Sequence, residues 1–146
     1  GFLALAITQQ AISMVGIDRL DKRQVSTLSD GERQKAMIAK ALAQQTEVIY
    51  LDEPTAFLDY PSKLDMLMLL RRISQQAKKT VLLSTHDLEL ALQLADRLWL
   101  LDSRGLTIGT PRQLADSGVL TSFIEREGVS FQPDNLSIRV ERNTLA

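Results

Sequence analysis

The chain has 146 residues, 45% of them hydrophobic and 24% charged, which suits one globular domain with its own core. Its formal net charge is −1 and it contains no cysteine, which excludes a disulfide framework, a thiolate metal site and a strongly basic nucleic-acid-binding surface. A chain without cysteine is compatible with a reducing compartment. We therefore expect a cytoplasmic protein that binds no nucleic acid and reaches a membrane only through a partner protein.

The N-terminal segment predicts a helix rather than a membrane anchor. Its apolar run is interrupted at Thr8, which makes it too short to span a bilayer, and no basic segment precedes it as in a secretory signal. Apolar residues at helical spacing predict a helix over residues 2–15, which Gly16 ends. Because the chain starts without Met and inside this helix, we expect the front of the natural protein to be missing.

The middle of the chain alternates between predicted helices and strands. A helix begins near Ser29, and the short apolar runs at residues 48–51 and 80–84 predict two buried strands, the first of them buried on both faces. A further helix occupies residues 62–77 between these strands. The predicted core-facing residues of the two helices are Ala36, Met37, Ala41 and Leu42, with Ile38 beside them, and Leu64, Met66, Leu67, Met68, Leu70 and Ile73.

The last part of the chain continues this alternation. A helix over residues 87–94 precedes a strand over residues 97–101, in which we expect Trp99 to be a core residue. A turn at residues 103–105 then predicts a hairpin. The remaining predicted elements are a strand through Leu106 and Ile108, a helix from Pro111 to about Asp116, a helix over residues 118–127 and a hairpin around residues 133–135.

Strands that are near-continuous apolar runs and alternate with helices predict an α/β fold with a parallel sheet. In such sheets, ligand sites gather at the carboxyl ends of the strands. Asp52 and Glu53 follow one predicted strand, and His86 follows the next. We therefore expect a site at this edge of the sheet.

Asp52 and Glu53 place two like charges side by side after an apolar strand. The first carboxylate suits Mg²⁺, which binds oxygen ligands, keeps several waters and implies phosphates as further ligands. The second carboxylate can polarise an attacking water in phosphoryl transfer. The same residues also fit a solvated acidic turn closed by Pro54, so the pattern alone leaves both interpretations open.

Ser29 and Glu32 stand three residues apart at the start of an amphipathic helix, which matches a capping box. A helix N-terminus with free N–H groups, the Ser29 hydroxyl and a glycine at Gly31 is also a suitable anion site. A bound phosphate would make both interpretations true.

His86 and Asp59 each have a structural and a functional interpretation. His86 is the only histidine and either contacts a phosphate or has a structural role, in which His86 or Asp87 caps the following helix. Asp59 is either functional or a turn residue before Pro61. A single histidine has no second histidine with which to form a metal site.

The order and spacing of these segments resemble the motifs of ATP-binding-cassette ATPases, over about residues 1–110. The similar segments are Leu28-Ser29-Asp30-Gly31-Glu32 (signature), Val48-Ile49-Tyr50-Leu51-Asp52-Glu53-Pro54 (Walker B), Leu58-Asp59 (D-loop) and Ser84-Thr85-His86-Asp87 (switch histidine). Within the family, residues 32–44 and 54–59 look most like importers of iron–siderophore, haem or cobalamin complexes.

The resemblance implies an enzyme that hydrolyses ATP with Mg²⁺ between two ATPase subunits. Asp52 would help hold Mg²⁺, Glu53 would orient the attacking water and His86 would contact the γ-phosphate. Asp59 would couple the two sites across the subunit interface. A transmembrane permease would hold the protein at the cytoplasmic face of the cell membrane.

Ser29, Gly31 and Glu32 would belong to the signature that binds the ATP of the opposite subunit. The common signature has glycine where this chain has Asp30 and glutamine where it has Glu32. Both carboxylates would repel a nearby triphosphate, so we expect them to point away or to act as helix caps. The backbone and Ser29 must then make the phosphate contacts.

The largest departure from the family is the Walker A loop, because no Gly-x-x-x-x-Gly-Lys-[Ser/Thr] segment occurs in the sequence. We expect a P-loop NTPase-like parallel sheet with flanking helices, truncated by the missing Walker A strand, which leaves a gap between strands 80–84 and 97–101. We also expect the chain alone to be inactive, because the β- and γ-phosphates lose their cradle.

We expect three regions: residues 1–45 as part of a helical subdomain, 46–117 as the C-terminal part of the ATPase core, and 118–146 as an extension without an assigned role. Two alternatives to a transport ATPase stay open. One is a cassette ATPase of translation or chromosome maintenance, and the other is a non-enzymatic remnant that binds a partner. The tandem cassettes or long coiled coils usual in the first alternative are not seen in this sequence.

Overall fold

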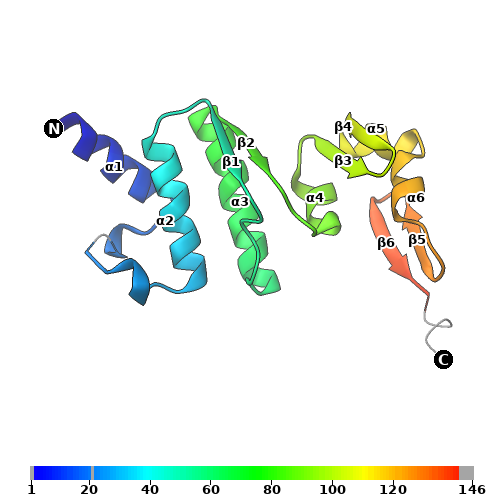
Figure 1. Cartoon of the computed structure of the whole chain (residues 1–146), viewed down its shortest axis with the longest axis horizontal. Helices are drawn as coiled ribbons and strands as arrows, with labels where there is room; N and C mark the ends of the chain where they lie inside the picture. Colours follow the sequence, from blue (N-terminus) through cyan, green and yellow to red (C-terminus); the bar gives the residue numbers. More distant parts are fainter. Residues whose placement is uncertain (1, 21, 142–146) are drawn as a thin grey trace. The chain divides into compact units, whose positions relative to one another are not determined.

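The computed structural model describes residues 2–20 and 22–141. Its contacts divide the chain into two compact units, Gly1–His86 and Asp87–Ala146. Figure 1 labels the α-helices and strands of both units. Within the described residues, no helix combines the length and the apolar composition that a bilayer-spanning segment needs.

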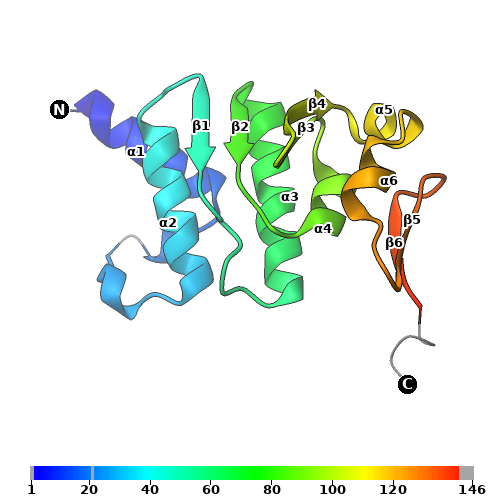
Figure 2. The same cartoon turned by 45° about the vertical axis from the view of Figure 1, so that its right-hand side comes forward.

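The first unit consists of a helical part followed by a β–α–β part. Its elements are α1 (Phe2–Met14), η1 (Asp18–Leu20), η2 (Val25–Thr27), α2 (Asp30–Ala43), β1 (Val48–Leu51), α3 (Tyr60–Ala77) and β2 (Thr80–Leu83). The helix α1 packs against α2, and α3 packs against β2. The strands β1 and β2 pair in parallel and α3 connects them (Figure 2), so the predicted parallel pairing of these strands is confirmed.

Local sequence explains where the helices of this unit begin and end. Gly16, with φ +72°, follows α1 in the left-handed conformation that glycine adopts without strain. Ser29 and Asp59 cap α2 and α3, each with a side-chain oxygen that accepts a backbone N–H. The predicted helices are therefore confirmed, although α3 begins at Tyr60, slightly earlier than expected.

The strand β1 is not buried on both faces, and that prediction was wrong. The strand β2 was also predicted to be buried, but its residues are exposed or half-buried. Ile49 is 2% exposed, whereas Val48 and Tyr50 are 54% and 64% exposed. Alternate residues of a strand point to opposite faces, so one face of β1 packs inside the unit and the other is uncovered among the described residues. An apolar run does not show this, because valine and tyrosine suit either face of a strand.

The buried stripes of α2 and α3 also differ from the predicted ones. Met37 and Met68, both predicted to be core residues, are 55% exposed. The buried residues of these helices are Ile38, Ala39 and Leu42 in α2 and Met66, Leu67, Leu69, Leu70 and Ile73 in α3. Both helices carry apolar residues on more than one face, so the packing of neighbouring elements selects the buried stripe.

The second unit combines short helices with antiparallel hairpins. Its elements are α4 (Leu88–Leu94), β3 (Leu98–Asp102), β4 (Gly105–Gly109), α5 (Pro111–Asp116), α6 (Val119–Ile124), β5 (Val129–Gln132) and β6 (Ser137–Val140). The strand β3 pairs with β4, and β5 pairs with β6, which confirms both predicted hairpins. The helix α6 ends at Ile124, before the predicted residue 127, because the backbone of Glu125 is extended.

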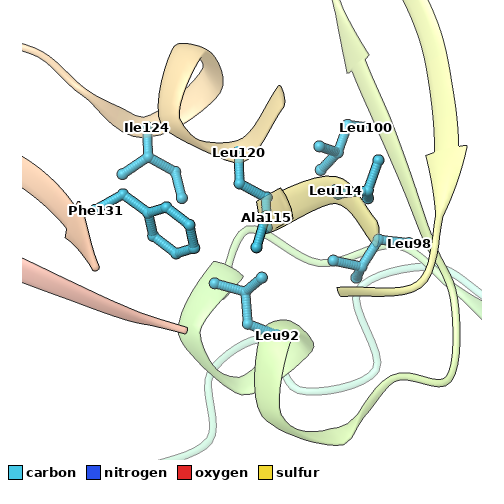
Figure 3. Packing of buried hydrophobic residues seen from close by; sticks show 8 residues of the cluster. All are labelled: Leu92, Leu98, Leu100, Leu114, Ala115, Leu120, Ile124 and Phe131. Atoms are coloured by element: carbon cyan, nitrogen blue, oxygen red, sulfur yellow. The ribbon is translucent and has the colours of Figure 1, made fainter. Parts of the chain in front are cut away.

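An apolar cluster forms the core of the second unit (Figure 3). Its buried members are Leu92, Leu98, Leu100, Leu114, Ala115, Leu120, Ile124 and Phe131. Leu120 is fully buried, and it comes from α6, which packs against α5 and β5. The cluster thus joins the helices and both hairpins of this unit.

Trp99 is not a core residue, contrary to the prediction. Leu98 and Leu100 are each 7% exposed, whereas Trp99 and Leu101 are 56% and 74% exposed, because successive strand residues face opposite sides. Among the residues that the structure describes, β3 is hydrogen-bonded to β4 alone. The predicted gap between the strands at residues 80–84 and 97–101 concerns strands of two different units and stays a prediction.

Candidate functional site

Asp52 and Ser84 lie side by side because the parallel register of β1 and β2 brings the two strand ends together. Leu51 is the register partner of Leu83, and the Ser84 N–H donates to the Leu51 carbonyl oxygen at 3.0 Å. The Ser84 hydroxyl donates to Asp52 Oδ1 at 2.6 Å and accepts from the Glu53 N–H at 2.9 Å. One hydroxyl therefore links the end of β2 to both carboxylate residues.

Glu53 and His86 also meet at this edge of the sheet. His86 Nε2 lies 2.9 Å from Glu53 Oε1, with the His86 side chain 96% exposed and that of Glu53 34% exposed. The cap of α4 comes from Asp87 instead, whose Oδ1 accepts from the Leu90 N–H at 3.3 Å. The structure thus brings together the polar residues that follow two different strands and leaves His86 outside the helix cap.

The turn after β1 holds Glu53 in an uncommon backbone conformation. Its φ of +47° lies in the left-handed region, which costs a residue other than glycine about 1–3 kcal/mol. The Glu53 carbonyl accepts from the Ala56 N–H at 3.0 Å. Pro54 is fully buried and Thr55 is 3% exposed, so these two residues anchor the turn on the unit.

The capping box predicted at the start of α2 is present. Ser29 Oγ accepts from the Glu32 N–H at 3.2 Å, and the Glu32 carboxylate accepts from the Ser29 N–H at 2.9 Å. The hydrogen bond from the Ser29 backbone lowers the pKa of Glu32 from its ordinary value. Asp30 forms a 3.6 Å ion pair with Arg33. Glu32 therefore acts as a cap, as expected, and Asp30 is paired within its own helix turn.

Gly31 and Asp59 lie at neighbouring parts of the same unit. A Cβ atom at Gly31 would be 4.0 Å from Leu58 Cδ2, so the start of α2 adjoins the loop that precedes α3. Asp59 Oδ1 accepts from the Ser62 N–H at 2.9 Å. Hydrogen bonds from the side chain and the backbone of Ser62 lower the pKa of Asp59. Asp59 is a helix cap, and its role at a subunit interface stays a prediction.

Asp52 fits a hard cation that is bound mainly through water and phosphate. The residue is exposed, and Ser84 engages one of its two carboxylate oxygens. Within residues 2–20 and 22–141, no group of three or more His, Cys, Asp or Glu side chains gathers as a metal cage. A bound Mg²⁺ would therefore need ligands from nucleotide, water or another protein segment.

Ser84 was not among the residues predicted for the site. A signal was present, because a hydroxyl residue directly follows one strand while an acidic pair directly follows the other. The hydrogen bonds depend on the register of β1 against β2, which joins residues 32 positions apart. Neither strand shows that register by itself.

Comparison with known proteins shows which family the chain resembles. The sequence pattern of the ABC transporter family matches residues 5–56. The achromobactin transport ATP-binding protein CbrD of Dickeya dadantii is 40% identical, over 79% of this chain and 43% of its own length. The petrobactin import ATP-binding protein FpuD of Bacillus anthracis is 33% identical, over 83% of this chain and 45% of its own length. The resemblance to ATP-binding-cassette (ABC) ATPases is confirmed.

The match to ABC ATPases extends to other relatives and to the fold. The cobalamin import ATP-binding protein BtuD of Halobacterium salinarum is 34% identical over 92% of this chain. The chain spans less than half the length of each of these relatives. A metal-chelate type ABC transporter in an inward-facing conformation superposes with a TM-score of 0.76 at 25% identity, over 97% of this chain and 58% of that chain. The predicted ABC ATPase fold is confirmed, and the roles of individual site residues stay predictions.

Proposed function

We propose that the chain is part of the ATP-binding subunit of an ABC importer, in which ATP hydrolysis drives solute uptake. The observation that carries this proposal is the cluster at the ends of β1 and β2, where Glu53 follows Asp52 directly and lies 2.9 Å from His86. The names of the relatives describe achromobactin transport and petrobactin and cobalamin import. An iron–siderophore, haem or cobalamin complex is therefore the class of solute that we propose.

Glu53 is the residue that we assign to the attacking water. His86 Nε2 holds its Oε1 oxygen, and the other carboxylate oxygen can accept a hydrogen bond from a water molecule. A carboxylate in this position orients the water for in-line attack on the γ-phosphorus. When bound, ATP would supply the phosphoryl group and Mg²⁺ would neutralise charge on the phosphate oxygens.

The other site residues have roles in holding the nucleotide. We assign Asp52 to Mg²⁺, and Ser29 and Gly31 to the γ-phosphate of an ATP held by a second ATPase subunit. Free N–H groups in the first turn of α2 favour an anion there. Glu32 supports this turn through its capping bond, and Asp59 couples the two sites from the adjoining loop.

A transmembrane permease is the second partner that we propose. It would contact the helical region at residues 1–45, hold the protein at the cytoplasmic face of the membrane and select the solute. The relatives named above are transport or import proteins, which favours this function over a cassette ATPase of translation or chromosome maintenance.

We also propose that this chain alone does not hydrolyse ATP, because its sequence contains no Walker A loop to cradle the β- and γ-phosphates. Phosphate release from Mg²⁺–ATP by the 146-residue chain should equal that of its Glu53→Gln variant. Mg²⁺-dependent hydrolysis that Glu53→Gln abolishes would contradict this proposal.

The proposed function is tested in the complete protein, expressed from its full coding sequence with its permease. Glu53→Gln should lower kcat by about 10²- to 10⁴-fold and leave the KM for ATP nearly unchanged, because it removes a general base and not a binding group. Glu47→Gln changes an exposed glutamate before the other end of β1 and should retain activity. Wild-type activity in Glu53→Gln would rule out the assigned role of this cluster.

A further inference from the structure

We propose that Ser84 is a positioning residue for both carboxylates, an assignment that rests on the proposed ATPase function. Its hydroxyl donates to Asp52 Oδ1 and accepts from the Glu53 N–H, at 2.6 and 2.9 Å. A hydroxyl has one donor and two acceptor lone pairs, so both bonds form at once. A single atom of Ser84 therefore orients the carboxylate assigned to Mg²⁺ and locates the glutamate assigned to the water.

The bond to Asp52 acts on the orientation of its carboxylate. Hydrogen bonds from a hydroxyl to an ionised carboxylate are short and about twice as strong as neutral ones, and 2.6 Å is in that range. With Oδ1 engaged, Oδ2 is the oxygen presented to a cation, which suits the monodentate carboxylate ligation of Mg²⁺. Because Asp52 is exposed, its side chain would sample several rotamers without this bond.

The hydrogen bond between the Glu53 N–H and Ser84 Oγ constrains the backbone of Glu53. The Glu53 N–H donates to Ser84 Oγ, and the Glu53 carbonyl accepts from the Ala56 N–H at 3.0 Å. These two bonds fix both the N–H and the carbonyl group of Glu53, whose φ is +47°. Such a backbone conformation persists only when surrounding contacts stabilise it. This backbone conformation sets the direction of the Glu53 Cα–Cβ bond, and the Glu53 carboxylate lies 2.9 Å from His86 Nε2.

Pairing of the strands does not require the Ser84 side chain. The bond that ends the ladder runs between backbone atoms, from the Ser84 N–H to the Leu51 carbonyl at 3.0 Å. Ser74 offers a matched control in the same unit, because its part-buried hydroxyl donates to the Lys79 carbonyl at 2.9 Å. Removing either hydroxyl deletes a local hydrogen bond, but of these two serines it is Ser84 whose hydroxyl bonds to Asp52 and Glu53.

The test compares Ser84→Ala, Ser84→Thr and Ser74→Ala in the complete ATPase with its partner chains. Ser84→Ala should lower kcat by about 10- to 100-fold, leave the KM for ATP within about twofold and raise the Mg²⁺ concentration needed for half-maximal rate. Ser84→Thr keeps the hydroxyl and should restore both kcat and the Mg²⁺ requirement. Ser74→Ala should match the wild type in both quantities.

Amide hydrogen exchange provides a readout that needs no turnover. Ser84→Ala should speed exchange at the Glu53 amide, whereas Ser84→Thr and Ser74→Ala should not. Any one of three results would overturn the inference. These are wild-type kinetics in Ser84→Ala, a loss of kcat that Ser84→Thr does not restore, and unchanged amide exchange at Glu53 in Ser84→Ala. Failure of Glu53→Gln to reduce hydrolysis would instead overturn the proposed function, so the two failures are distinguishable.

Discussion

His86 Nε2 lies 2.9 Å from Glu53 Oε1, although the two residues follow different strands. The ring of His86 is 96% exposed, so it contributes little to burial, and its contact with Glu53 orients that carboxylate. His86→Ala in the complete protein should therefore lower kcat by about 10²-fold or more, because Glu53 loses the group that holds it. Steady-state phosphate release measures this effect.

The control measurement for His86→Ala is its stability toward urea. Since the side chain is exposed, the urea midpoint of His86→Ala should match that of the wild type. His86→Gln retains a hydrogen-bond donor and should recover part of the activity. A parallel loss of midpoint and activity in His86→Ala would indicate a structural role and contradict the prediction.

Ser29 stabilises α2 through the capping box with Glu32. Ser29→Ala should lower the free energy of unfolding by about 0.5–2 kcal/mol, because the N–H of Glu32 loses its acceptor. Ser29→Thr keeps the acceptor and should stay close to the wild type. Ser26→Ala, an exposed serine shortly before the cap, is the matched control in urea unfolding. Equal losses at Ser26 and Ser29 would contradict the capping role.

Asp59 makes the stability of α3 dependent on pH. Hydrogen bonds from Ser62 lower the pKa of Asp59 in the folded protein, so its contribution is complete above the ordinary pKa of aspartate and is lost as pH falls through the lowered value. Asp59→Asn also caps helices but does not titrate, so its loss of stability in this acid range should be smaller. Urea unfolding over a series of acidic pH values compares the two proteins. Identical pH profiles would contradict the assignment.

Leu120 is a central residue of the apolar core in the second unit (Figure 3). It is fully buried, so Leu120→Ala should lower the free energy of unfolding of that unit by about 2–5 kcal/mol. Leu101→Ala removes the same atoms from a residue that is 74% exposed and should cost much less. Fluorescence of Trp99, the only tryptophan, reports unfolding of this unit. Similar losses in the two variants would contradict the burial of Leu120.

The sequence predicted which residues form the site more completely than it predicted the contacts between them. The residue types of Asp52, Glu53 and His86 indicated phosphoryl-transfer chemistry, and their places after apolar strands indicated one sheet edge. The structure brings Glu53 and His86 into contact and adds Ser84 beside Asp52. These contacts could not be predicted because they depend on the pairing of β1 with β2.

Sequence by itself determined the features that depend on neighbours within about one helical turn. The capping box at Ser29 and the glycine at the end of α1 are of this kind and were predicted. The cap at Asp59 is equally local, although Asp59 was interpreted as a turn residue or a functional residue. Only the tertiary structure decided which faces of β1 and β3 are covered, and that the Ser84 hydroxyl bridges a carboxylate 32 residues away. The physical reason is that strand register and packing bring distant segments together. In addition, an apolar strand has the same residue types whether or not another layer of the fold covers it.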